Sequence, residues 1–213
     1  MHIFKLFIFY LYIMQLHPVY IALGVIFTIA FILVAAEILS DNVAQDRLNS
    51  VINNEDTKYQ SCINSSQFNQ YLRRVLEQAS KYGISGTPSF LINQGKIVGN
   101  QNMVVFENAI QNPEGEPIRE LYEYDDIVFG DPNAPVWVVE FSSPLCPHCQ
   151  RFHKEKFKEI YNKYISTGKV FWILKGTSIF GRVQERELIG LVYCTSLYDR
   201  ENLLNVVDRV FGS

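Results

Sequence analysis

The hydrophobic positions of this 213-residue chain fall into one long N-terminal run followed by shorter periodic segments. Residues 3–36 contain a single charged side chain, Lys5, and residues 19–36 are uncharged and mostly apolar. An 18-residue helix at about 1.5 Å per residue nearly spans a hydrocarbon core of about 30 Å. We therefore predict a transmembrane anchor within residues 1–37. A cleaved signal peptide is the alternative, because residues 34–36 (Val-Ala-Ala) resemble a small-residue cleavage site.

The next part of the chain has helical periodicity and then two short apolar runs. Helical spacing is seen at residues 42–54, 67–82 and 104–110, and the second helix has Ser65 or Ser66 as its N-cap and Gly83 as its stop. The segment SFLINQGKIVG predicts two strands joined by a tight turn at residues 93–95. Residues 38–111 thus form the first predicted structural segment.

Residues 112–134 are rich in proline, glycine and acidic residues, which predicts a linker. In residues 135–213, the apolar runs VWVVEF and KVFWILK predict buried strands. A helical pattern starts at CPHC, and helical spacing returns from residue 182 onward. Residues 135–213 thus form the second predicted structural segment.

Charge and cysteine content narrow the class of function. The formal net charge of −3 gives no electrostatic reason to expect nucleic-acid binding. Lys5 precedes the apolar run and acidic residues follow it, so the positive-inside rule places the rest of the chain outside the cytoplasm. In that oxidising setting, the four cysteines indicate disulfide chemistry before metal binding.

The motif C-P-H-C at residues 146–149 carries the strongest chemical signal. Cys146 precedes a predicted helix, where free N–H groups and the helix dipole favour its thiolate. Pro147 is tolerated at an early helical position, His148 adds a donor beside the sulfur, and Cys149 can close an internal disulfide. A static disulfide or half of a zinc site, with His153 on the same helix, are the alternatives.

The stretch GDPNAPVWVVEFSSPLCPHCQRFH resembles the start of the thioredoxin-fold domain in the DsbA family of exported thiol oxidases. The resemblance implies that Cys146 is the attacking cysteine and Cys149 the resolving one. It also implies that Glu140 is the acidic residue beneath the active site, where it accepts protons or tunes the cysteine pair. The implied fold is of the α/β class, a thioredoxin-like core with a helical insertion.

The earlier stretch GISGTPSFLINQGKIVG resembles the cis-proline segment of the same family. The resemblance implies a cis bond between Thr87 and Pro88, since X–Pro bonds are the ones for which the cis form is cheap. The Thr87 backbone would then face Cys146 and pair with an extended substrate strand.

In that family the C-x-x-C half precedes the cis-proline half, whereas here the two halves are exchanged. Two explanations fit: a circular permutation within the helical insertion, or a fragment of two tandem copies whose halves pair between chains. The resemblance also implies a second, non-catalytic disulfide between Cys62 and Cys194, with two buried free thiols as the alternative.

Together these features predict a membrane-tethered thiol–disulfide oxidoreductase of the inner membrane, with its catalytic part on the periplasmic side. Its only redox group would be the Cys146–Cys149 disulfide, without metal or other cofactor. Expected partners are reduced exported proteins, a membrane redox partner that reoxidises the enzyme, and the lipid bilayer. A reductase or isomerase on the same scaffold, and a non-catalytic remnant, are the alternatives.

Overall fold

The computed structural model describes residues 25–36, 38–39, 42 and 57–212, and the chain divides into the units Met1–Val43 and Ala44–Ser213. In the first unit, residues 25–36 are helical and their side chains are exposed. Within the described ranges, no helix is both long enough and apolar enough to cross a bilayer. Residues 1–24 of the predicted anchor, and residues 43–54 of the first predicted helix, lie outside the described residues.

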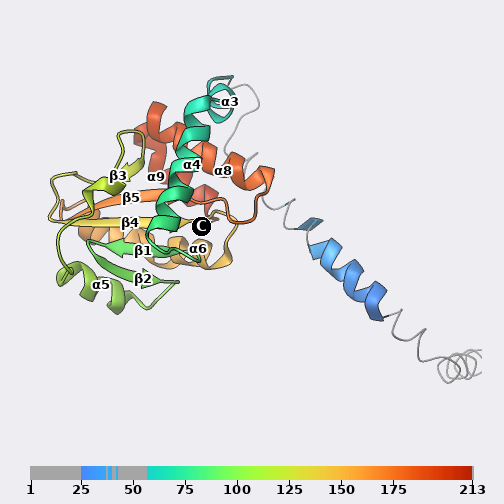
Figure 1. Cartoon of the computed structure of the whole chain (residues 1–213), viewed down its shortest axis with the longest axis horizontal. Helices are drawn as coiled ribbons and strands as arrows, with labels where there is room; N and C mark the ends of the chain where they lie inside the picture. The colour runs from blue at the N-terminus through green and yellow to red at the C-terminus, as the bar shows by residue number, and fades with distance from the viewer. Residues whose placement is uncertain (1–24, 37, 40–41, 43–56, 213) are drawn as a thin grey trace, which may run out of the picture. The chain divides into compact units, whose positions relative to one another are not determined.

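The second unit is built on a five-stranded mixed sheet with the order β2-β1-β4-β5-β3 (Figure 1). Strands β4 and β5 are parallel, and every other neighbouring pair is antiparallel. The strands are β1 (Ser89–Ile92), β2 (Gly95–Val98), β3 (Ile127–Phe129), β4 (Val136–Ser142) and β5 (Val170–Gly176).

The two central strands are those with the most continuous apolar sequence. All seven residues of β4 and all seven of β5 are buried, as expected for parallel strands covered on both faces. Strand β1 is also buried throughout, whereas the edge strand β2 alternates between covered and exposed positions. The predicted hairpin at residues 89–98 and both predicted buried strands are therefore confirmed.

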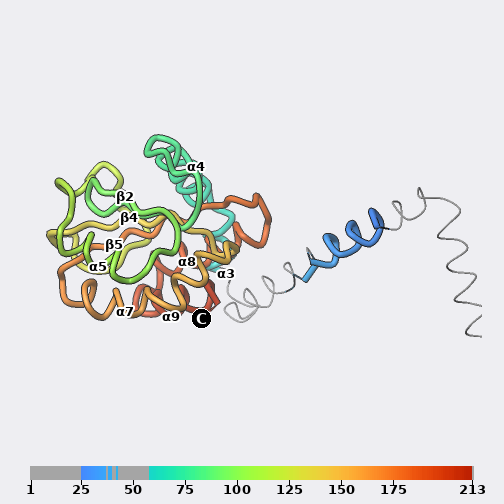
Figure 2. Tube along the Cα trace, turned by 90° about the horizontal axis from the view of Figure 1, so that it is seen from below, coloured from blue at the N-terminus to red at the C-terminus, as the bar shows by residue number. Residues whose placement is uncertain are grey.

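Helices lie on both faces of the sheet, with α4 on one side and α5, α7 and α9 on the other (Figure 2). The Tyr71 hydroxyl of α4 accepts a hydrogen bond from Gly176 N at the end of β5 (2.9 Å). The helices are α3 (Thr57–Ile63), α4 (Ser66–Lys81), α5 (Met103–Gln111), α6 (Pro147–Phe152), α7 (Lys158–Ile160), α8 (Val183–Tyr198) and α9 (Leu203–Val210). Shorter π-helical or 3-10 segments are η1 (Arg119–Leu121), η2 (His153–Phe157), η3 (Tyr161–Ile165) and η4 (Arg200–Asn202).

Helix α4 begins and ends where its sequence predicts. The Ser65 side chain accepts a hydrogen bond from Phe68 N (3.1 Å), which satisfies one of the free donors of the first turn. After the helix, Gly83 adopts a φ of 61°, a left-handed conformation that glycine tolerates best.

The segment predicted as a linker, residues 112–134, contains ordered structure. It includes η1 and strand β3, which pairs with β5 and forms one edge of the sheet. The prediction differs from the structure because β3 has only three residues, too few for a readable strand pattern among the surrounding turn-forming residues.

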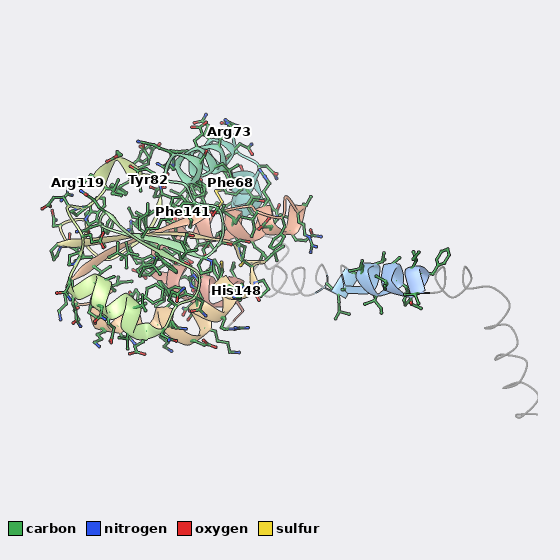
Figure 3. The ribbon with its side chains drawn as sticks, turned by 60° about the horizontal axis from the view of Figure 1, so that its bottom comes forward. Phe68, Arg73, Tyr82, Arg119, Phe141 and His148 are labelled. Carbon is green, nitrogen blue, oxygen red and sulfur yellow. A yellow bond between two sulfur atoms is a disulfide. The ribbon has the colours of Figure 1, made fainter. Side chains whose placement is uncertain are left out.

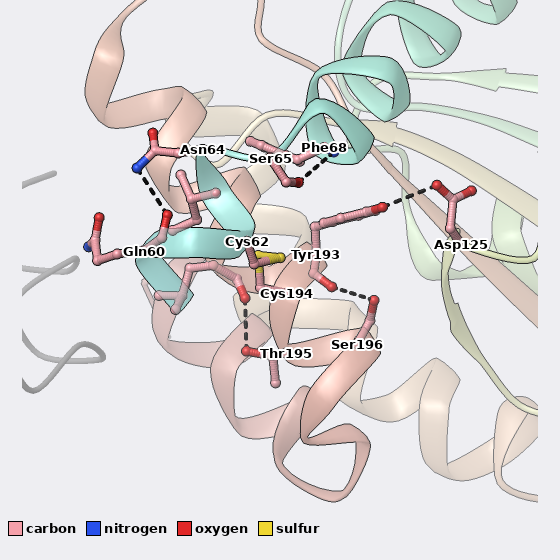
Figure 4. Close-up of a disulfide and its surroundings, with 12 residues drawn as sticks. Gln60, Cys62, Asn64, Ser65, Phe68, Asp125, Tyr193, Cys194, Thr195 and Ser196 are labelled. Atoms are coloured by element: carbon pink, nitrogen blue, oxygen red, sulfur yellow. Dashed lines mark hydrogen bonds between the residues drawn. A yellow bond between two sulfur atoms is a disulfide. The ribbon is translucent and has the colours of Figure 1, made fainter. Parts of the chain in front are cut away.

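A disulfide joins Cys62 in α3 to Cys194 in α8, the pairing that the family resemblance implies. Figure 4 shows the bond between the two sulfurs. The two cysteines are 132 residues apart in the chain, and both are buried. The disulfide therefore ties the segment before the hairpin to the helices that follow the C-P-H-C motif.

Candidate active site

The two cysteines of the C-P-H-C motif lie where β4 passes into α6. Cys146 is the N-cap of α6, and Cys149 lies within the first turn and has no exposed surface. Pro147 occupies the first helical position, where the missing N–H costs no hydrogen bond. Pro147 and His148 are exposed, and Figure 3 shows His148 at the surface of the molecule.

The cis-proline segment reaches the same place from the other half of the chain. The Thr87–Pro88 peptide bond is cis, and the Cys146 thiol donates to the Thr87 carbonyl oxygen at 3.3 Å. This contact follows from the sheet, because β1 pairs with β4 so that Ser89 lies opposite Phe141. Residues 59 positions apart are thus brought together within one chain.

The surroundings give the two sulfurs opposite acidities. The pKa of the Cys146 thiol is lowered from 9.0 to about 5, chiefly by a hydrogen bond with the Cys149 side chain. The Thr87 side chain and the N–H groups of Cys149 and His148 lower it further, while burial opposes them. Burial, and the hydrogen bond with Cys146, raise the pKa of Cys149. These shifts favour a thiolate at Cys146 and a protonated thiol at Cys149.

Glu140, the acid that the resemblance places beneath the site, is completely buried on β4. One of its oxygens lies 2.8 Å from His153 Nε2, and the other accepts a hydrogen bond from Trp172 Nε1 at 3.1 Å. The sequence suggested His153 only as a zinc ligand, but in the structure it is the partner of this acid. Its position seven residues after Cys146, on the same helical segment, was the only available signal.

Two further polar residues contact the site and were not predicted. Ser143 N donates to Cys149 Sγ (3.5 Å), and the Ser143 hydroxyl donates to Glu185 Oε1 (2.5 Å). Glu185 belongs to α8, 36 residues after Cys149 in the sequence, and lies outside any motif; Ser143 lies within the stretch that carries the family resemblance, but no role was predicted for it. Only the folded chain brings Glu185 to the loop that precedes the cysteines.

Comparisons with known proteins identify the family. A family model described as thioredoxin matches residues 30–112 and 123–187. A protein of Rickettsia felis named "Putative protein-disulfide oxidoreductase" is 39% identical over 67 residues, which is 30% of this chain and 24% of the relative. A similarly named protein of Rickettsia prowazekii is 31% identical over 93 residues, 43% of this chain and 34% of the relative.

Two solved structures are also similar. Oxidised BdbD from Bacillus subtilis has 26% sequence identity and a TM-score of 0.38, covering 46% of this chain and 50% of BdbD. Wolbachia pipientis alpha-DsbA1 has 25% identity and a TM-score of 0.27, covering 42% of this chain and 53% of that protein.

The chain therefore belongs to the thioredoxin family, whose model matches more than half of its residues. This membership confirms the thioredoxin-like fold that the family resemblance implies. The chain matches only about a quarter to a third of the length of these curated relatives. The comparisons do not test whether its two halves are circularly permuted, so the permutation stays a prediction.

Proposed function

We propose that the chain is a thiol–disulfide oxidoreductase that introduces disulfides into reduced, exported proteins. The observation that carries the proposal is the contact between Cys146 Sγ and the Thr87 carbonyl oxygen at 3.3 Å. The contact supports the proposal, because a thiolate at Cys146 would lie beside a backbone edge with which an extended substrate can pair.

In the oxidising direction, a substrate thiolate attacks the Cys146 sulfur of a Cys146–Cys149 disulfide. The S–S bond breaks, Cys149 leaves and takes up a proton, and the substrate is held to Cys146 in a mixed disulfide. A second substrate thiolate attacks the substrate sulfur, and Cys146 leaves as a thiolate. Two electrons pass to the enzyme, one substrate proton stays on Cys149, and the other is released to solvent.

The difference in acidity favours this direction. A lowered Cys146 pKa stabilises the reduced enzyme, so the enzyme disulfide is a stronger oxidant. A low pKa also makes Cys146 a better leaving group in the second step. Reoxidation then requires a membrane redox partner that accepts the two electrons through a disulfide of its own.

We also propose that the N-terminal segment tethers the enzyme to the inner membrane, with the catalytic part on the periplasmic side. The described helix at residues 25–36 supports this, because its large apolar side chains are exposed, including Phe27 and Phe31 at 72% and 75%. If the segment is an anchor, the full chain stays in the membrane fraction after alkaline extraction. Release into the supernatant would contradict the anchor and leave the redox proposal intact.

The redox proposal is tested by oxidation of a reduced, unfolded substrate and by insulin reduction with the purified full chain. Cys149→Ser should accumulate a mixed disulfide with substrate, whereas the matched variant Cys146→Ser should form none. A folded chain without activity, or with activity unchanged in Cys146→Ser, would contradict the proposal and favour a non-catalytic module. A reduction potential near that of thioredoxin would instead favour a reductase or isomerase.

A further inference from the structure

A second buried carboxylate lies close to the redox pair. Glu185 has no exposed surface, and its two oxygens accept four hydrogen bonds. Oε1 accepts from the Ser143 hydroxyl (2.5 Å) and Ile179 N (3.1 Å), and Oε2 accepts from the Ser178 hydroxyl (2.9 Å) and Phe180 N (2.9 Å). A carboxylate offers about four acceptor positions, so this pattern uses all of them.

Ser143 connects this carboxylate to both cysteines. Its backbone N–H donates to Cys149 Sγ (3.5 Å), and its carbonyl oxygen accepts from Cys146 N (3.1 Å). Its hydroxyl donates to Glu185 and accepts from Leu145 N (3.2 Å). Ser143 is itself completely buried, so its orientation is set by these bonds rather than by water.

We propose that Glu185 is a positioning residue for the redox pair, because it holds the Ser143 hydroxyl and so keeps the Ser143 N–H against the Cys149 sulfur. This inference rests on the proposed function, since it concerns the same two cysteines. The Glu185 carboxylate also accepts hydrogen bonds from Ser178, Ile179 and Phe180 in the loop between β5 and α8. These bonds hold the carboxylate in place together with its bond to the Ser143 hydroxyl.

The direction of the effect follows from what the N–H does at sulfur. In the reduced pair the Ser143 N–H donates to the Cys149 sulfur, which stabilises the reduced form. Loosening Ser143 removes this support from the reduced pair, so the enzyme disulfide becomes relatively more stable and a weaker oxidant. Glutamine cannot replace Glu185, because its amide nitrogen would meet donors where an oxygen now accepts.

The first test compares two serines that each donate one hydroxyl to Glu185. Only Ser143 also contacts the cysteines, so Ser178→Ala is a matched control for Ser143→Ala. The equilibrium between the full chain and glutathione is measured by alkylation and mass spectrometry. We expect Ser143→Ala to shift the equilibrium constant at least threefold toward the enzyme disulfide, about 14 mV for a two-electron couple. A smaller shift, or an equal shift in Ser178→Ala, would overturn the inference.

A double-mutant cycle separates a positioning role from a simple charge effect. Glu185→Gln should shift the equilibrium in the same direction as Ser143→Ala, and the double variant should shift it no further than the larger single change. Removing a nearby negative charge alone would favour the thiolate and shift the equilibrium the other way, which would contradict the inference. Glu187→Gln, on the same helix, is the control and should leave the equilibrium unchanged.

Two outcomes keep the inference independent of folding and of the proposed function. If Glu185→Gln does not fold, the comparison of Ser143→Ala with Ser178→Ala still decides the question. Insulin turnover by the parent chain reports on the proposed function alone. A parent chain without turnover, whose glutathione equilibrium nevertheless shifts in Ser143→Ala, would contradict the proposed function and support the role of Glu185.

Discussion

Cys146 and Cys149 carry the same thiol group three residues apart, but their surroundings lower the pKa of Cys146 and raise the pKa of Cys149. Cys146 is at the helix N-cap, where a hydrogen bond with the Cys149 side chain, then the Thr87 side chain and the N–H groups of Cys149 and His148, support a negative sulfur. Cys149 is one turn inside and completely buried, which penalises its charge. The division of roles therefore comes from position within the first helical turn.

The lowered pKa of Cys146 predicts how the reduced enzyme reacts as pH changes. Alkylation of Cys146 by iodoacetamide should follow the thiolate, with a midpoint near pH 5 in place of the usual value near 9. Cys149 should stay unmodified over this range, because its pKa is raised. Alkylation rates, resolved by peptide mass spectrometry, measure both. A midpoint above pH 7 for Cys146 would contradict the assignment of the nucleophile.

The same shift affects the stability of the reduced form. Because the folded pKa of Cys146 is below the unfolded value, it adds stability that is full above about pH 9 and is lost as pH falls to about 5. The free energy of unfolding of the reduced chain, relative to Cys146→Ser, should therefore rise with pH across this interval. Urea unfolding at several pH values tests this, and a difference independent of pH would contradict it.

Glu140 is expected to matter for stability as well as chemistry. Glu140→Ala would leave the buried His153 Nε2 and Trp172 Nε1 without their partner, and it should cost on the order of 3 kcal/mol. The control Glu155→Ala removes an exposed carboxylate on the helical segment that carries His153, and it should cost less than about 1 kcal/mol. Urea unfolding measures both, and equal losses would contradict a structural role for the Glu140 cluster.

At the scale of elements, β3 is held to the sheet by a buried ion pair as well as by its strand pairing. Lys175 Nζ of β5 lies 2.6 Å from Asp126 Oδ2, and neither side chain is exposed. Burial raises the pKa of Asp126 and lowers that of Lys175, while each partner opposes the shift of the other. Asp126 immediately precedes β3, so the pair fixes where that short edge strand begins.

Breaking this pair should destabilise the fold strongly. Asp126→Asn leaves Lys175 buried without its counter-charge, which should cost about 3–5 kcal/mol. The control is the more exposed ion pair between Lys163 and Glu107, for which Glu107→Gln should cost less than about 1 kcal/mol. A loss below 1 kcal/mol for Asp126→Asn, measured by urea unfolding, would show that the pair does not secure β3.

Elements whose residues carry a clear local pattern, such as a helix cap or a continuous apolar run, could be predicted from the sequence. Elements whose position depends on residues far away in the chain could not. The cap at Ser65, the hairpin at residues 89–98 and the all-apolar runs of β4 and β5 carry local signals. Strand β3 is only three residues long and depends on β5 and Lys175 for its place. Glu185 is likewise unpredictable, because a glutamate in a helix gives no sign of its own burial.

At the scale of the whole molecule, the Cys62–Cys194 disulfide closes a loop of 132 residues that contains the entire sheet. A cross-link of that span restricts the unfolded chain strongly, by about 5 kcal/mol in the loop-entropy model. Without it, α3 would be held to α8 by packing and by Arg186, which donates to the Ile63 carbonyl oxygen at 2.8 Å.

Removing the disulfide should therefore lower stability by several kcal/mol. The double variant Cys62→Ala/Cys194→Ala is compared with its parent in a background where Cys146 and Cys149 are alanine, so that only one disulfide is changed. We expect a loss of about 4–5 kcal/mol in the free energy of unfolding by urea. A loss below about 2 kcal/mol would mean that packing and the Arg186 hydrogen bond secure α3 to α8 without the disulfide.

The order of the halves raises the question of whether the site forms within one chain or between two. In the structure, Thr87 and Cys146 of the same chain are in contact, and the same chain provides both Cys62 and Cys194. A swapped pair of chains would preserve each contact but make it intermolecular. The disulfide would then link two chains covalently, so the two arrangements differ in a directly measurable way.

We predict that the site is intramolecular, and a complementation experiment tests this. Cys146→Ala and Thr87→Arg each damage one half of the site, and each should be inactive when refolded alone. If halves paired between chains, refolding the two variants together without reductant would create some intact sites and restore activity. We expect no activity in the mixture and only monomers on a non-reducing gel, because both the redox contact and the Cys62–Cys194 disulfide close within one chain. Restored activity together with a disulfide-linked dimer would instead establish the exchanged arrangement.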